Sequence, residues 1–464
     1  MIEVCLFQIR DNFKNLKFVI SFLLIVILFI LNALFFSFRT ENRLIEYNKI
    51  EKSSEGAIRD ASSRLNDLIF INHLLIKKPL NSEFIINGNQ DIFPDGFTLN
   101  VKSINLPEKV FHDNEGNSNL PPIDWFFIIS IILLFLIFTL TYDSISGEKE
   151  LGTFKLVFSN SINKLEFLIG KIAGISMSVM IPILLGILLN IFIIIILGKI
   201  TFDSKLLVQV FFLIFYTTFY VMFFVTLGMF ISFISNNSLK SLIICSLLWI
   251  VLVVIIPVIV KITITNLYEI PSKNDYEIEL QEADNRLVEF LSKYEAGSRG
   301  IEAGKIDDYK KEKGEALAQQ ELANLKQKIT NTYIEKKFSQ ANLFYNILSI
   351  SPVYLFQSTL EKLFGTGLER DKKIYKEARE FQLTLINFYK NEDIKDASSP
   401  NVHFLYNYLS AKGINYSNIP KFKENVDSTA NLILKSSSAF VFLFLEFVII
   451  LGVICILFLK AVLS

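Results

Sequence analysis

The segment from Tyr142 to Ser161 carries the charged and apolar side chains best suited to recognition chemistry. Four charged residues lie within 143–150, a small Gly152-Thr153 step follows, and an apolar turn comes next. Carboxylates beside an apolar ridge suit a short interfacial helix that offers both to another protein. An ordinary charged loop is the alternative, and the spacing alone leaves both open. The apolar turn consists of Phe154, Leu156, Val157 and Phe158.

No other group of residues favours catalysis or metal binding. The three histidines, His73, His112 and His403, are isolated, so a His-Glu-x-x-His metal motif is missing. A Gly-x-x-x-x-Gly-Lys-Ser/Thr phosphate loop is missing too, and the nearest run, at 300–305, has the wrong spacing and indicates a helix break. The three cysteines are scattered and show no metal or disulfide spacing. We therefore expect no catalytic, cofactor-binding or metal site in this chain.

Hydrophobic runs predict the elements that position the acidic segment. Hydrophobic residues make up 52% of the chain, and about 20 consecutive apolar residues cross ~30 Å of hydrocarbon. The first run is too long for a signal peptide and lacks a cleavage site, so it reads as an uncleaved anchor. The six predicted spans cover 17–38, 123–142, 172–197, 206–234, 241–260 and 439–459.

Lysine and arginine in the short connections predict the orientation, because positive residues stay on the cytoplasmic side. With the N-terminus inside a bacterial plasma membrane, nine basic residues fall on the inner side. Only two fall in the short outer loop. Both termini are therefore expected to be cytoplasmic. The inner residues are Arg10, Lys14, Lys17, Lys149, Lys155, Lys164, Lys171, Lys240 and Lys460, and the outer ones are Lys199 and Lys205.

These assignments predict an all-α polytopic membrane protein. The N-terminal unit, 1–38, joins an amphipathic helix at the inner interface to the first span. A small mixed α/β outer loop covers 39–122, with a helical start and a strand-like stretch from Phe84 to Val101. Spans two to five occupy 123–260 and enclose a cytoplasmic loop at 143–171. A large helical outer loop covers 261–438, and 439–464 holds the sixth span and a short tail.

The large outer loop contains two stretches with helical periodicity. Helices packing on one another explain this pattern, and helices that grip a partner or cargo outside the membrane are the alternative. The sequence leaves both open. The two stretches place Leu322, Leu325, Ile329 and Tyr333, and then Ile374, Ala378, Phe381, Leu385 and Phe388, at helical spacing.

Glu446 is a charged residue inside the otherwise apolar sixth span. A carboxylate at this depth costs ~2.5–3.5 kcal/mol on insertion scales, so such residues usually face an interior or a cavity. One interpretation makes Glu446 an intramembrane polar site that contacts substrate or protons. The other has it protonated, or hydrogen-bonded to Thr217, Thr218 or Asn190.

The acidic segment resembles the signature of ABC type-2 exporter permeases. In that signature an aromatic-Asp-x-Ile-Ser-Gly-Glu-(Lys/Arg)-Glu-x-Gly-Thr run precedes a Leu-rich helix and a serine. Leu168-Ile-Gly-Lys171 is similar to the family's entry into its third span, although the usual proline near 160–161 is absent. The run Ser351-Pro-Val-Tyr-Leu-Phe-Gln-Ser-Thr-Leu, with 365–367 and Phe381-Gln, resembles a subgroup with an enlarged second outer loop. That subgroup is related to permeases described as linked to multi-copper enzyme maturation.

The resemblance implies a transport subunit without ATPase motifs of its own. It would pair with a second permease chain and with a cytosolic ABC ATPase that binds ATP and Mg. The first helix would be an elbow helix, and 148–166 would hold the coupling helix that seats in the ATPase. Glu148 and Glu150 would form ion pairs to that subunit, and Gly152 would allow close backbone approach. The implied coupling residues are Glu148, Glu150, Gly152, Thr153, Phe154, Leu156 and Phe158.

Two rival functions remain open at this stage. A membrane enzyme is disfavoured by the isolated histidines. A membrane-anchored receptor or scaffold would use the outer helical domain to bind a partner, but it leaves six spans and an acidic inner helix unexplained. Copper cargo has little support, because three cysteines and five methionines form no cluster and soft metals favour such ligands. Net charge is zero, and nothing indicates nucleic-acid binding.

Overall fold

The computed structural model describes residues 1–88, 94–110, 123–154, 163–197, 203–294, 306–402 and 405–461. Within these residues six helices are long and apolar enough to cross a membrane, as the hydrophobic runs predicted. They are α2 (Leu16–Ala61); α4, η1, α5 and α6 together (Trp125–Phe127, Ile128–Ile132, Leu133–Thr141 and Ser146–Glu150); α8 (Lys164–Ile196); α9 (Ser204–Ile234); α10, η2 and α11 together (Ser238–Ile250, Val251–Ile255 and Ile256–Leu267); and α17 (Thr429–Ala461).

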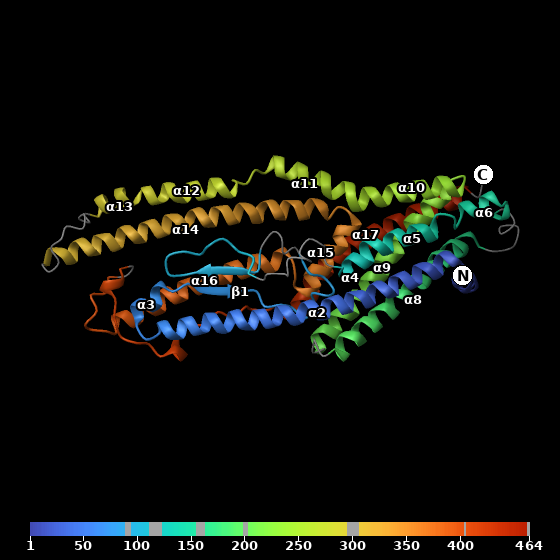
Figure 1. Cartoon of the computed structure of the whole chain (residues 1–464). Coiled ribbons are helices and arrows are strands. Elements are labelled where there is room, and N and C mark those ends of the chain that lie inside the picture. Colours follow the sequence, from blue (N-terminus) through green and yellow to red (C-terminus); the bar gives the residue numbers. More distant parts are fainter. Residues whose placement is uncertain are drawn as a thin grey trace.

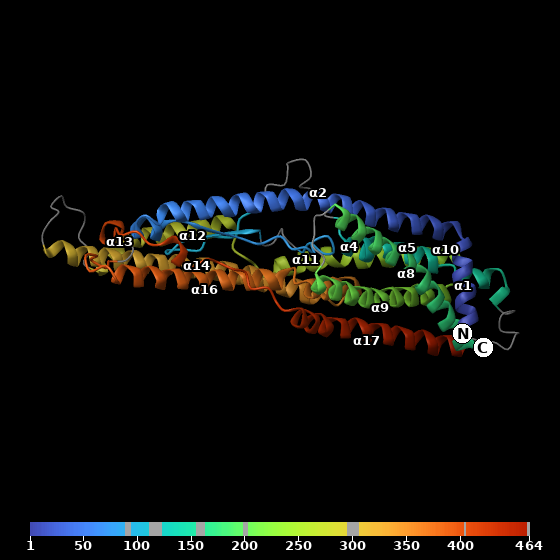
Figure 2. The same cartoon turned by 90° about the horizontal axis from the view of Figure 1, so that it is seen from below.

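The molecule is elongated, with the spans gathered at one end and a mostly helical region at the other (Figures 1 and 2). We call this second region the outer region, after the location that the sequence predicts for it. Both termini lie at the span end, close to α6. Helix α2 has 46 residues, which is ~70 Å at 1.5 Å per residue. It therefore continues well past the predicted end of the first span and runs along the outer region.

Helix α1 (Ile2–Lys14) crosses α8 at two glycines. A Cβ at Gly170 would lie 2.9 Å from the Val4 Cβ, and one at Gly174 would lie 2.7 Å from the Gln8 Cβ. The polar side of α1 faces this contact, because the Asn12 Nδ2 donates to the Ser178 Oγ over 3.0 Å. The apolar side chains Ile2, Leu6, Phe7 and Phe13 are exposed, as expected for a helix that presents them to lipid.

The outer region has its own apolar core. Helices α12 (Lys273–Asn285), α13 (Leu287–Lys293) and α16 (Leu368–Ile394) pack around α14 (Ile306–Leu348) together with α3 (Leu65–Phe70). The predicted periodic residues Leu322, Ile329 and Tyr333 on α14, and Ile374, Ala378 and Leu385 on α16, are buried in that core. Two single-turn helices, η3 (Tyr406–Tyr408) and η4 (Tyr416–Asn418), lie in the connection to α17.

The strand prediction for the first outer loop was correct only in part. The two-stranded antiparallel sheet pairs β1 (His73–Ile76) with β2 (Gly96–Leu99). Phe84 and its two neighbours instead form a turn, not a strand. The Phe84 ring packs on Trp125 with ring centroids 5.1 Å apart. Apolar side chains favour a strand only because they favour burial, and here the turn buries them against the spans.

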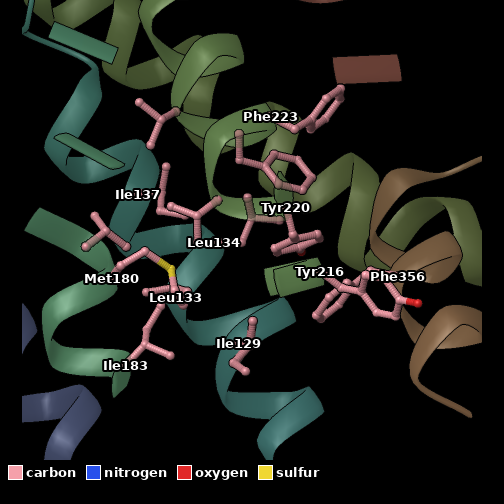
Figure 3. Packing of buried hydrophobic residues seen from close by; sticks show 14 of the residues in the cluster. Ile129, Leu133, Leu134, Ile137, Met180, Ile183, Tyr216, Tyr220, Phe223 and Phe356 are labelled. Atoms are coloured by element: carbon pink, nitrogen blue, oxygen red, sulfur yellow. The ribbon is translucent and has the colours of Figure 1, made fainter. Parts of the chain in front are cut away.

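Helix α15 (Pro352–Phe364) enters the bundle from the outer side. The Phe356 ring stacks on Tyr220 with centroids 4.4 Å apart (Figure 3), and the Tyr354 hydroxyl donates to the Val253 carbonyl over 3.2 Å. Tyr220 lies ~24 Å along α9 from its start at Ser204. The helix therefore reaches the middle of the fourth and fifth spans.

Candidate functional site

The acidic segment forms a compact turn at the end of the second span. After α5 the chain makes a short turn and forms α6, which ends at Glu150 with Leu151 as its C-cap residue. Gly152 follows with φ +70°, a left-handed conformation that glycine adopts without steric cost. Its amide donates to the Lys149 carbonyl over 3.1 Å, so the turn is closed by its own backbone. We call residues 142–154 the inner junction, after the cytoplasmic side on which the sequence predicts them to lie.

The inner junction is fixed to the start of the first span. The Lys17 Nζ donates to the Tyr142 hydroxyl over 2.6 Å and to the Asp143 Oδ2 over 2.8 Å. The same ammonium lies 4.6 Å from the centroid of the Tyr142 ring. A cation held by a carboxylate, a phenol and an aromatic face is better anchored than by an ion pair alone.

A second ion pair joins the inner junction to the third span. Lys171 on α8 pairs with Glu148 on α6, and its Nζ also donates to the Ser144 carbonyl over 2.7 Å. The Lys171 side chain is 9% exposed and that of Glu148 is 25% exposed. Because Lys171 is buried, removing Glu148 would leave a charge with fewer partners, which is costly inside a protein.

The fourth span contributes hydroxyl and carbonyl groups. The Ser232 Oγ of α9 accepts from the backbone amides of Ile145 and Ser146, both over 3.0 Å. These amides begin α6 and would otherwise lack partners. Lys149 donates to the Phe233 carbonyl, where the C-terminal end of α9 carries partial negative charge.

The inner junction also contacts the fifth and sixth spans. Glu150 accepts from the Ser238 amide over 3.0 Å and from its hydroxyl over 2.7 Å, so its carboxylate caps the N-terminal end of α10. The Phe154 ring meets Phe458 of α17 edge to face, with centroids 6.2 Å apart. The inner junction thus continues the second span and bonds to or packs on the other five.

These contacts give several of the predicted coupling residues partners within the chain itself. Glu148 and Glu150 are engaged inside the chain, and Phe154 packs on the sixth span; ion pairs or pockets in another subunit stay predictions. Leu156 and Phe158 lie outside the described residues. Sequence reasoning missed the roles of Lys17, Lys171 and Ser232, although the inner lysines were visible as orientation signals.

One side of the inner junction is open. Leu151 is 80% exposed, Thr153 is exposed, and a Cβ at Gly152 would meet nothing within 4 Å. An exposed leucine between charged residues at the span end of the molecule offers an apolar contact point. Sequence reasoning missed Leu151, because a single leucine before a glycine carries no periodic signal.

Glu446 lies in the middle of α17 with part of its side chain covered. Its Oε2 is buried and has no hydrogen-bond partner among the described residues. The expected partners are engaged elsewhere: Asn190 donates to the Phe29 carbonyl and to Asn32, and Thr218 donates to the Ile214 carbonyl. The hydrogen-bonded interpretation was therefore wrong for Asn190 and Thr218, because each faces a different neighbour.

Comparison with known proteins gives a match over nearly the whole chain. A protein family described as "ABC-2 family transporter protein" matches residues 8–463. The matched region includes the inner junction, all six spans and both of the large loops between them. No curated protein sequence matches the chain.

Proposed function

The chain belongs to the ABC-2 transporter family as a membrane-spanning permease subunit, and we propose that its inner junction couples a separate ATPase to substrate movement. The observation that carries this proposal is the set of contacts from residues 142–154 to every span. A force applied to this segment would reach α2 through Lys17, α8 through Glu148 and α10 through Glu150.

The inner junction has two faces, and we assign a different role to each. The inward face is bonded to the spans, and the outward face presents Leu151, Gly152 and Thr153. We propose that the outward face seats on the ATPase subunit, which binds ATP and Mg and performs the hydrolysis. When the ATPase subunit moves, the hydrogen bonds and ion pairs between the inner junction and the spans must stay intact. Rigid, bonded elements then pass the displacement on to the spans.

A second permease chain would complete the pathway. In the fifth span, Ser238–Leu267, only 11% of an 18-residue hydrophobic stretch is buried inside the chain, which leaves a long apolar face for lipid or for another copy. Membrane helices associate by packing such faces. We propose that two permease chains, identical or paired, assemble with two ATPase subunits and move a substrate across or out of the membrane.

The orientation proposed for this assembly places both termini and the inner junction in the cytoplasm of a bacterial cell. The excess of lysine and arginine at the span end supports this orientation. The two large loops would then be extracytoplasmic. ATP is available on the cytoplasmic side, so the junction would lie where an ATPase can reach it.

The proposal is tested with the permease and its ATPase reconstituted in nanodiscs. Spin labels at Leu207 and Leu267, at the outer ends of α9 and α11, report whether ATP changes the distance between the fourth and fifth spans. We expect an ATP-dependent change in the native complex. We expect it to be lost in the double variant Glu148→Gln, Glu150→Gln although the ATPase remains bound. An unaltered distance change in the double variant would contradict the proposed coupling.

A further inference from the structure

A groove opens on the outer region between α2, β1 and the segment that follows η4. It holds about 790 Å³ of space that is partly open to solvent, and it lies far from the inner junction along the molecule (Figure 1). We call it the edge groove. Its lining includes Tyr47, Glu51, Ser54, Glu55 and Ile58 of α2, His73–Ile76, Phe381, and Tyr416, Ile419, Pro420, Lys421 and Phe422.

The register of the sheet shows which backbone groups of β1 face this groove. Leu75 pairs with Phe97 and His73 with Leu99. The Lys77 amide donates to the Asp95 carbonyl, while Gly96 exchanges hydrogen bonds with Glu108 on the opposite edge of β2. Hydrogen-bonded and non-hydrogen-bonded pairs alternate in an antiparallel ladder. The N–H and C=O groups of Leu74 and Ile76 therefore point away from β2.

These four backbone groups have no hydrogen-bond partner among the described residues. Leu74 and Ile76 are partly exposed and both line the edge groove. An unpaired strand edge is a template for another extended chain, because only a second backbone supplies donors and acceptors at the same spacing. A lipid chain would leave all four groups unsatisfied.

The walls of the edge groove supply apolar surfaces beside this edge. Leu75 and Ile419 are buried, and the rings of Phe381 and Phe422 pack edge to face with centroids 5.6 Å apart. His73 contacts the Tyr389 hydroxyl at 3.1 Å, and burial lowers the His73 pKa to about 4. This wall is therefore uncharged at neutral pH and suits the alternate apolar side chains of an extended peptide.

The charges on the rim favour a basic residue in the occupant. Lys421 is compensated by Glu55, with 2.7 Å between Nζ and Oε1. Glu51 accepts from the Tyr47 hydroxyl over 3.2 Å but has no ion pair within the described part of the chain. No basic residue of the described ranges therefore pairs with this carboxylate at the groove.

We propose that the edge groove binds an extended polypeptide segment by strand addition to β1. The bound segment carries alternating apolar side chains and a lysine or arginine opposite Glu51. This assigns the outer region a peptide-binding role that is independent of coupling at the inner junction. Failure of one role would leave the other intact.

The test uses the full chain in nanodiscs with Cys5, Cys245 and Cys455 replaced by serine and with Ser54→Cys at the groove wall. Three thiol probes are attached there by a disulfide, which raises their local concentration. The first is a cysteine-containing peptide of alternating valine and lysine. The second is the same peptide N-methylated at alternate residues, and the third is dodecanethiol. Hydrogen exchange of the Leu74 and Ile76 amides is the readout.

We expect the unmodified peptide to slow exchange at both amides by at least about tenfold, while the N-methylated peptide and dodecanethiol leave it unchanged. The variant Ile76→Pro removes one edge donor without breaking a bond to β2, and it should abolish protection at Leu74. Equal protection by dodecanethiol would show a lipid-type groove and overturn the proposal. Absence of protection by the unmodified peptide would also overturn it.

Discussion

Glu148 of α6 is ion-paired with Lys171 of α8, and the same lysine donates to the Ser144 carbonyl. A carboxylate that the sequence pattern assigned to a partner protein is thus engaged with the third span. The pair links α6 directly to α8. Binding of an ATPase at the exposed side of the inner junction would then be felt inside the bundle.

Exchanging the charges of this pair tests that link. Lys171→Glu alone should place two carboxylates together and cost about 3 kcal/mol of stability, with loss of ATP-driven movement of the spans. The double variant Glu148→Lys, Lys171→Glu should recover most of both. Thermal unfolding and spin-label distances in nanodiscs measure the two effects. If the single and double variants lose stability and span movement to the same extent, the Glu148–Lys171 pair does not link α6 to α8.

Leu151→Asp should weaken binding of the ATPase subunit without unfolding the permease. Leu151 is 80% exposed, so the substitution removes an apolar contact and creates no buried charge. Leu239→Asp, at the start of α10 and 67% exposed, is the matched control. Copurification of the ATPase should fall for Leu151→Asp and stay near native for the control. Equal retention by both variants would argue against Leu151 as a contact.

Glu361, near the C-terminal end of α15, predicts a pH dependence in the outer region. Burial raises its pKa to about 7, with added repulsion from Asp371 and Asp124, although Gln357 donates to it. The folded state therefore holds this proton more tightly than the unfolded state, and stability falls as pH rises from about 5 to 8.

Glu361→Gln should remove that dependence. At pH 8 the variant should unfold at a higher temperature than the native chain, and at pH 5 the two should coincide. Thermal unfolding in nanodiscs across this pH range provides the measurement. A variant that is equally destabilised at both pH values would show that the carboxyl group makes a structural contact whatever its charge, and would contradict the predicted pH dependence.

The variant Glu446→Leu tests whether the carboxylate of Glu446 serves function or stabilises the fold. Removing an unpartnered carboxylate from the middle of α17 should stabilise the chain by up to ~3 kcal/mol, because insertion scales assign about that cost to a charge at this depth. Ser438→Leu, nearer the start of the same helix, serves as the control. If Glu446→Leu destabilised the protein, the carboxylate would have a structural partner and the proposed intramembrane site would be withdrawn.

Hydrophobic length alone predicted all six spans, because crossing a bilayer imposes a run of apolar residues. It could not predict that α2 continues to Ala61, since the outer half of that helix is polar and receives its support from packing. Strand β1 was missed because His73–Ile76 is too short for alternation to stand out.

The charges in the sequence located the candidate site, but they could not predict which residues its side chains bond to. Nothing in the spacing of Glu148 and Glu150 shows that their partners are Lys171 and Ser238, which come from other spans. Such pairs depend on how helices pack, and a single sequence carries no record of that. The exposed Leu151 was missed because a single leucine before a glycine carries no periodic signal, and its exposure is a property of the folded chain.

Cross-linking at Leu151 tests the central claim most directly. With Cys5, Cys245 and Cys455 replaced by serine and Leu151→Cys added, a thiol-reactive cross-linker is applied to the permease assembled with its ATPase subunit in membranes. We predict a cross-link between the two subunits whose yield changes with ATP, and loss of ATP-driven movement of the spans once it forms. A complex that hydrolyses ATP and moves its spans without any cross-link at Leu151 would contradict the claim.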